Sequence, residues 1–77
     1  MPRFPLTLSS VNDVKRFVDL AVTCPCDVDV ISGRYLVNGK SIMGLFSIDL
    51  SQPVEVEVSD PNACEALRSM LKASQNG

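Results

Sequence analysis

Apolar residues recur in this chain with two different periods, and the order of the two periods limits the possible folds more than any other property. From Val11 to Val22 they recur every three or four residues, which is typical of an amphipathic helix. Residues 53–59 instead alternate strictly between valine and polar residues, which is typical of a strand with one face in water. The chain must therefore pack helices against a sheet.

The first helix is expected to begin after Ser10. A serine hydroxyl accepts from a backbone N–H of the first turn, and Asp13 places a carboxylate where negative charge is favourable. Its apolar side would consist of Val11, Val14, Phe17, Val18, Ala21 and Val22. Pro25 cannot continue this helix and favours extended backbone at the residue before it, so we expect a strand from Cys26.

Four further elements complete the pattern. Residues 4–8 suit an opening strand, and Ser32-Gly33 lies between two strand-like runs as a two-residue hairpin linker. Asn38-Gly39 is another hairpin signal, but residues 41–46 do not alternate, so periodicity leaves open a short helix capped by Ser41. Asp60-Pro61 predicts the start of a last helix, whose buried side would consist of Ala63, Ala66, Leu67, Met70 and Leu71.

This order of elements predicts an α+β fold in which an antiparallel sheet carries its helices on one face. A chain of 77 residues buries only about 60% of the surface that it exposes when unfolded. We therefore expect residues 1–77 to form a single domain with one core.

Composition excludes several classes of function. The net charge is −2 and the seven lysines and arginines are scattered, so no basic stripe exists for a nucleic-acid backbone. No apolar run is long enough to span a bilayer, and prolines interrupt the N-terminal residues where a secretory signal would be apolar. We expect a cytoplasmic protein without membrane insertion.

The cysteines Cys24, Cys26 and Cys64 predict neither a disulfide framework nor a metal site. Their number is odd, and a bridge across the single residue between Cys24 and Cys26 would be strained. The chain contains no histidine, so a zinc ion would lack a fourth nitrogen or sulfur ligand. A nucleophilic cysteine would equally lack a histidine base. We therefore expect no cofactor and no enzymatic activity.

Residues 39–44 form the most specific sequence motif in the chain. Gly39-Lys40-Ser41-Ile42-Met43-Gly44 resembles the regulatory serine segment of HPr, the small phosphocarrier of the bacterial sugar phosphotransferase system. The spacing from Phe17 to Ser41 matches the family as well. The resemblance implies the HPr fold, an open-faced β-sandwich of order βαββαβα in which helices cover one face of a four-stranded antiparallel sheet.

The resemblance also implies roles for individual residues. Ser41 corresponds to the serine that the family phosphorylates, and Ile42, Met43 and Phe46, with Lys40 beside them, correspond to its docking surface. The implied partners are HPr kinase and a transcription regulator or phosphotransferase component. A phosphate at this helix start would place about two negative charges beside an apolar contact surface.

The chain departs from the family at the phosphocarrier site. HPr carries phosphate on a histidine at the start of its first helix, and Ser10 stands at the matching position of this chain, which has no histidine. A phosphoserine ester is far more stable than phosphohistidine and would stop a relay. Two hypotheses remain: a regulatory protein switched at Ser41, or an unregulated interaction module on the same scaffold, in which Ser41 only caps a helix.

Overall fold

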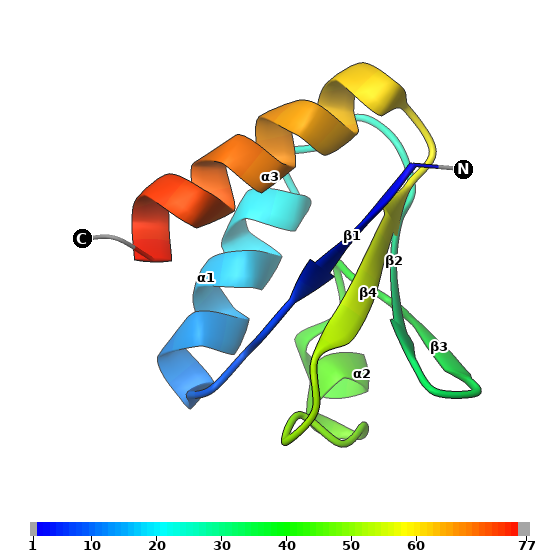
Figure 1. Cartoon of the computed structure of the whole chain (residues 1–77), viewed down its shortest axis with the longest axis vertical. Coiled ribbons are helices and arrows are strands. Elements are labelled where there is room, and N and C mark those ends of the chain that lie inside the picture. The colour runs from blue at the N-terminus through cyan, green and yellow to red at the C-terminus, as the bar shows by residue number, and fades with distance from the viewer. Residues whose placement is uncertain (1, 76–77) are drawn as a thin grey trace.

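The computed structural model describes residues 2–75, and its elements follow the predicted order (Figure 1). They are β1 (Arg3–Leu6), α1 (Val11–Ala21), β2 (Val28–Ser32), β3 (Tyr35–Asn38), α2 (Ile42–Phe46), β4 (Val54–Val58) and α3 (Pro61–Gln75). No helix among the described residues is both long and apolar enough to cross a membrane.

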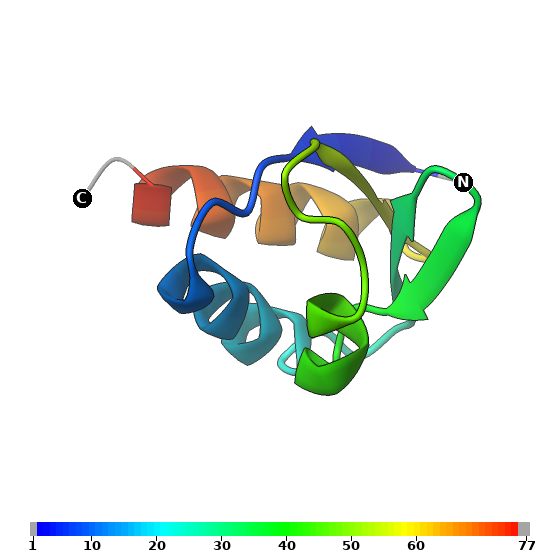
Figure 2. The same cartoon turned by 90° about the horizontal axis from the view of Figure 1, so that it is seen from below.

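The four strands form one antiparallel sheet in the order β1-β4-β2-β3. All three helices lie on one side of it (Figures 1 and 2), which confirms the predicted α+β architecture. Phe4, Val56 and Val30 are aligned across β1, β4 and β2, and all three side chains are buried under the helices. On the open face, the Arg3 guanidinium contacts the Glu57 carboxylate at 2.8 Å.

The core lies between the sheet and the helices, and Phe17 of α1 is its largest fully buried side chain. The predicted alternation of β4 is confirmed, since its three valines are buried while Glu55 is exposed. The first helix buries Val14, Phe17 and Ala21. The expectation that Val11 and Val22 join them was wrong, because they lie at and beyond the ends of α1 and are more than half exposed.

Several strand boundaries differ from the sequence expectations. β2 begins at Val28 and not at Cys26, because the chain still bends at Pro25 and Cys26. β1 ends at Leu6, although Leu8 beyond it is still buried. The hairpin loop is Gly33-Arg34 and not Ser32-Gly33, because Ser32 still pairs with Tyr35. Gly33 adopts a φ of 59°, and a glycine with positive φ at the first loop position is the arrangement that a two-residue hairpin favours.

The buried side of α3 is also rotated from the expected one. Cys64, Leu67 and Leu71 are buried, whereas Ala66 and Met70 are exposed. Both sets have helical spacing, and the buried Cys64 belongs to the core cluster as a small apolar side chain. The expectation for Leu67 and Leu71 is confirmed, and the one for Ala66 and Met70 was wrong.

Candidate functional site

Residues 38–47 fold as a turn followed by the short helix α2, and not as a second hairpin. Ser41 is the N-cap, with extended backbone and a hydroxyl that accepts from the Gly44 N–H at 3.2 Å. At the other end, Ser47 donates its hydroxyl to the Gly44 carbonyl at 2.6 Å. The cap predicted from the sequence is thus present, and the side chain of Ser41 is half-buried.

Gly39 brings this turn against the core. Its N–H donates to the carbonyl of Val28 at 2.7 Å, and a Cβ at this position would lie 2.8 Å from the Val28 Cγ1 atom and 3.3 Å from the Phe17 ring. Only glycine allows this approach without displacing a neighbour. Gly39, directly before Lys40-Ser41, therefore sets how close to the core the helix α2 begins.

Lys40 holds the start of α2 to the loop that follows α1. Its Nζ donates to the carbonyl oxygen of Cys24 at 2.9 Å, and its N–H donates to the Asn38 side chain at 2.9 Å. The Lys40 side chain is half-buried and thus has a structural contact. Its role in docking stays a prediction.

The four apolar side chains of α2 divide between the core and the surface. Leu45 is fully buried, and Ile42 is half-buried against the core. Met43 is 78% exposed and Phe46 is 45% exposed. Met43 and Phe46 are three residues apart and therefore neighbours on one face of the helix. Of the predicted docking residues, these two form the solvent-facing apolar surface.

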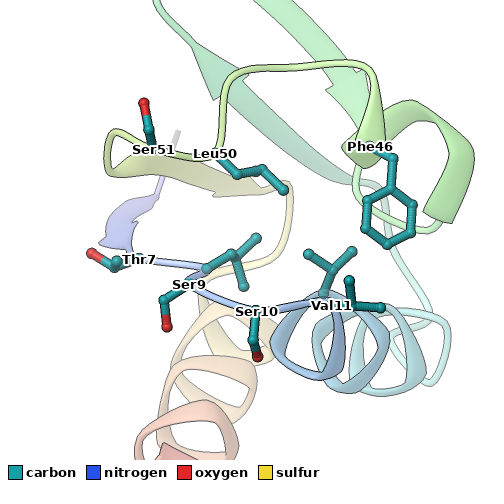
Figure 3. Close-up of a pocket in the computed structure, with 9 residues that line it drawn as sticks. Thr7, Ser9, Ser10, Val11, Phe46, Leu50 and Ser51 are labelled. Carbon is teal, nitrogen blue, oxygen red and sulfur yellow. The ribbon is translucent and has the colours of Figure 1, made fainter.

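Phe46 also borders a shallow depression of about 570 Å³ between the start of α1 and the end of α2 (Figure 3). Apolar side chains and hydroxyl groups line it together: Thr7, Leu8, Ser9, Ser10, Val11, Val14, Phe46, Leu50 and Ser51. Ser10, which the resemblance predicts to be the position of the carrier histidine, and Phe46 thus line the same depression. Ser41 lies at the opposite end of α2, beside Lys40.

Ser10 is engaged in capping α1. Its hydroxyl accepts from the Asp13 N–H at 3.1 Å, as the sequence predicted. The Asp13 carboxylate in turn accepts from the Ser9 hydroxyl at 2.9 Å and from the Ser9 N–H at 3.0 Å. These hydrogen bonds from Ser9 lower the pKa of Asp13, with Ser10 and the nearby Arg16 acting in the same direction.

A second carboxylate flanks the depression. The hydroxyl and the N–H of Ser51 donate to Asp49 at 2.5 and 2.9 Å, and they lower the pKa of this carboxyl group. Asp13 and Asp49 are therefore both ionised at neutral pH. Their charges disfavour an added phosphate at Ser9, Ser10 or Ser51.

The Asp13 contacts predict an acid-dependent stability. Because the pKa of Asp13 is lower in the folded chain, its stabilisation is present above the usual aspartate pKa of about 3.9 and is lost as the pH falls through the folded-state value. We expect Asp13→Asn to lower the urea midpoint at pH 6 but to differ less from the parent at pH 3. Asp19→Asn, an exposed position outside the first turn, is the control for charge alone. An equal Asp13→Asn deficit at both pH values would contradict this assignment.

The sequence did not identify Val11, Leu50 and Ser51 as neighbours of the candidate site. Val11 was assigned to the buried side of its helix, and Leu50 and Ser51 lie in the loop between α2 and β4, which carries no periodic signal. Val11 directly follows the predicted N-cap Ser10, and the first residue of a helix often lies outside its buried side. This position was the available sign that Val11 would be exposed. Among the described residues, no group of three or more cysteines or carboxylates could hold a metal ion.

Comparison with known proteins relates this geometry to one family. The sequence profile described as "PTS HPr component phosphorylation site" matches residues 12–76. The match thus includes Ser41 and the whole of α2, and it begins two residues after Ser10. No curated protein sequence matches the chain.

Three solved structures are similar to this one. HPr-C-His from Thermoanaerobacter tengcongensis has 22% identity and a TM-score of 0.80, over 100% of this chain and 98% of that one. The histidine-containing phosphocarrier protein of Mycoplasma has 14% identity and a TM-score of 0.73, over 92% and 89%. The Bacillus subtilis catabolite repression protein Crh, an intertwined domain-swapped dimer, has 26% identity and a TM-score of 0.65, over 87% and 83%.

Proposed function

The chain belongs to the HPr family of the phosphotransferase system, and on that premise we propose that it is a regulatory binding protein and not a histidine phosphocarrier. Residues 1–77 form one HPr-like domain under this proposal. It acts in the cytoplasm, catalyses no reaction of its own and binds protein partners through α2. Ser41 is the site at which a kinase switches that binding.

The exposure of Met43 and Phe46 directly after the capping serine is the observation that carries this proposal. These two side chains present apolar area to solvent on one face of α2, while Leu45 holds the helix to the core. A flexible methionine beside an aromatic ring suits an adaptable protein contact. Ile42 and Lys40 complete the docking surface at the half-buried start of the helix.

Phosphorylation of Ser41 would change this surface without unfolding it. A phosphoserine at the N-cap keeps oxygen acceptors near the Gly44 N–H and adds about two negative charges one turn from Phe46. A partner with an apolar contact would then be repelled, and one with a basic contact would be favoured. This is how one small surface would distinguish a transcription regulator from a phosphotransferase component.

The residues at the start of α1 support the proposal that this chain does not relay phosphate. The chain contains no histidine, and Ser10 is a helix cap beside the ionised Asp13. A phosphate there would meet like charge and, once attached as a serine ester, would not be passed on. The similar Bacillus subtilis protein Crh is described by its role in catabolite repression, which is a regulatory role.

Incubation with HPr kinase and ATP tests the switch. We expect the intact mass to rise by one phosphate in the parent chain and not in Ser41→Ala. Ser47→Ala removes the serine at the other end of the same helix and should be labelled like the parent. Failure to label the parent, while an ordinary HPr is labelled beside it, would exclude the switch at Ser41.

An unregulated interaction module is the second candidate, and the hydrogen bond from Gly44 to Ser41 favours it because it gives the hydroxyl a structural role. In that case Ser41→Ala lowers the free energy of unfolding by about 1 kcal/mol, and no kinase acts on the parent chain. Met43→Ala would still weaken partner binding. The kinase experiment therefore separates the two candidates.

A further inference from the structure

The two edges of the sheet differ in how they are protected. In β1, the Val58 N–H donates to the Pro2 carbonyl at 3.1 Å, and backbone groups alternate between the two sides of a strand. Pro5 therefore lies where an N–H would face outward, and proline has none to offer to an added strand. A proline at this position prevents further pairing at the β1 edge.

The opposite edge, β3, has no such protection (Figure 1). Its four residues include neither a proline nor a charged residue. Tyr35 is 66% exposed and Leu36 is 61% exposed, so the strand presents two large apolar side chains to solvent. An exposed apolar edge strand is a surface to which another strand can pair.

The backbone groups available on this edge follow from one hydrogen bond. The Gly39 N–H donates to the Val28 carbonyl at 2.7 Å, so Val37, two residues earlier, also directs its backbone groups toward β2. Leu36 and Asn38 therefore direct theirs toward the free edge. The Asn38 carbonyl already accepts from the Ser41 N–H at 3.0 Å. The N–H and carbonyl of Leu36 and the N–H of Asn38 remain for an added strand.

We propose that β3 pairs antiparallel with β3 of a second copy of this chain, with Leu36 on the twofold axis. Each Leu36 donates its N–H to the Leu36 carbonyl of the other copy. Asn38 lies opposite Arg34 of the second copy, and Tyr35 lies opposite Val37 of the second copy. The two sheets thus join into one continuous sheet, and this pairing does not depend on the proposed switch at Ser41.

The side chains of the edge complement themselves in this register. Leu36 pairs with the half-buried Ile31 on β2, and both side chains lie on the open face of the sheet. Across the twofold axis, this apolar pair meets the same pair of the second copy. On the helix-covered face, the Tyr35 ring lies against the half-buried Val37 of the second copy. Both exposed apolar residues of β3 are therefore covered.

Charge complementarity favours a second copy as the occupant. Asp29 lies on the open face between Asn38 and Glu57, and the Glu57 carboxylate already contacts Arg3. Asp29 therefore has a like charge beside it, which a further cation would offset. Arg34 is exposed and makes no ion pair among the described residues.

Pairing brings these two charges together. Arg34 of the second copy lies opposite Asn38, the strand neighbour of Asp29. The arginine and aspartate side chains together span the two strand spacings of about 4.8 Å between them. The twofold axis repeats this contact, so each copy supplies one cation and one anion to the interface.

Sedimentation velocity of the full chain under reducing conditions, from micromolar to millimolar concentration, tests the proposal. We expect the parent to shift from 8.3 kDa to twice that mass. Leu36→Lys should remain a monomer, because two ammonium groups would meet at the axis. Val22→Lys makes the same change at a position 54% exposed beyond the end of α1 and should dimerise like the parent. A parent that stays monomeric, or a dimer that persists in Leu36→Lys, would overturn the proposal.

A charge exchange tests the register. Arg34→Glu and Asp29→Arg each place like charges together, so each should lose the dimer at concentrations where the parent forms it. The double variant should recover it, because the two charges have changed places. Lys15→Glu, at an exposed position of α1, is the control for charge alone and should dimerise like the parent. Unchanged dimerisation in the single variants, or no recovery in the double variant, would exclude this register.

Discussion

Replacing Leu45 with alanine is expected to lower the free energy of unfolding by about 2–5 kcal/mol, because it removes a fully buried side chain that holds α2 to the core. The cavity would open between α2 and the sheet, where we expect few neighbouring side chains to shift and fill it. Urea denaturation followed by far-UV circular dichroism measures the change.

Met43→Ala is the matched control on the same helix. Its side chain is 78% exposed, so we expect a change within about 0.5 kcal/mol. Under the proposed function, the same variant loses partner binding at unchanged stability, whereas Leu45→Ala changes stability first. Equal stability losses in the two variants would contradict the division of α2 into a buried and an exposed side.

Replacing Gly39 with alanine is expected to cost about 1–3 kcal/mol of unfolding free energy. The new methyl group would lie 2.8 Å from the Val28 Cγ1 atom and 3.0 Å from the Val28 carbonyl oxygen, and the carbonyl belongs to a central strand that cannot yield cheaply. Thermal or urea unfolding gives the magnitude. The strained turn should also alter the position of Ser41, two residues later.

Two further variants isolate the steric cause. Gly33→Asn adds a side chain where no atom lies within 4 Å, and asparagine tolerates positive φ, so it should cost below about 1 kcal/mol. Val28→Ala removes the nearest atom that Gly39→Ala would strike, so the double variant should lose less than the sum of the single losses. Strictly additive losses would exclude a clash with the Val28 side chain.

The local sequence predicted the helix cap at Ser10 and allowed one at Ser41, because capping depends on local chemistry. Ser10 and Ser41 accept from the N–H three residues later, as their positions before helical patterns implied. The choice between a hairpin and a helix after Gly39 could not be made locally. In the structure Leu45 is fully buried and Gly39 donates its N–H to the Val28 carbonyl, and these tertiary contacts accompany the helix.

The sequence could not assign the buried side of α3, because two overlapping stripes both fit a helix. One runs through Ala66 and Met70, and the other through Cys64, Leu67 and Leu71. The position of the helix above β4 and the loop that carries Cys26 selects the second. In the structure Cys64 is buried, whereas Met70 is 39% exposed.

The depression beside Ser10 was beyond sequence reasoning for a similar reason. Its walls come from the start of α1, the end of α2 and the following loop, and only the packing of α1 against α2 brings these segments together. Ser51 and Asp49 have no helical or strand periodicity that would mark them. The hydrogen bond between Ser51 and Asp49 joins residues that are close in sequence. Its location across the depression from Ser10 depends instead on the tertiary fold.

The pairing of β1 with β4 bears on how the protein is made. Phe4 lies opposite Val56, so the first strand leaves the ribosome long before the segment that it pairs with has been translated. During that interval the apolar side chains of residues 4–8 have no sheet to join, and they are open to chaperones or to other nascent chains. We therefore expect the sheet to close late, once β4 has emerged and can pair with both β1 and β2.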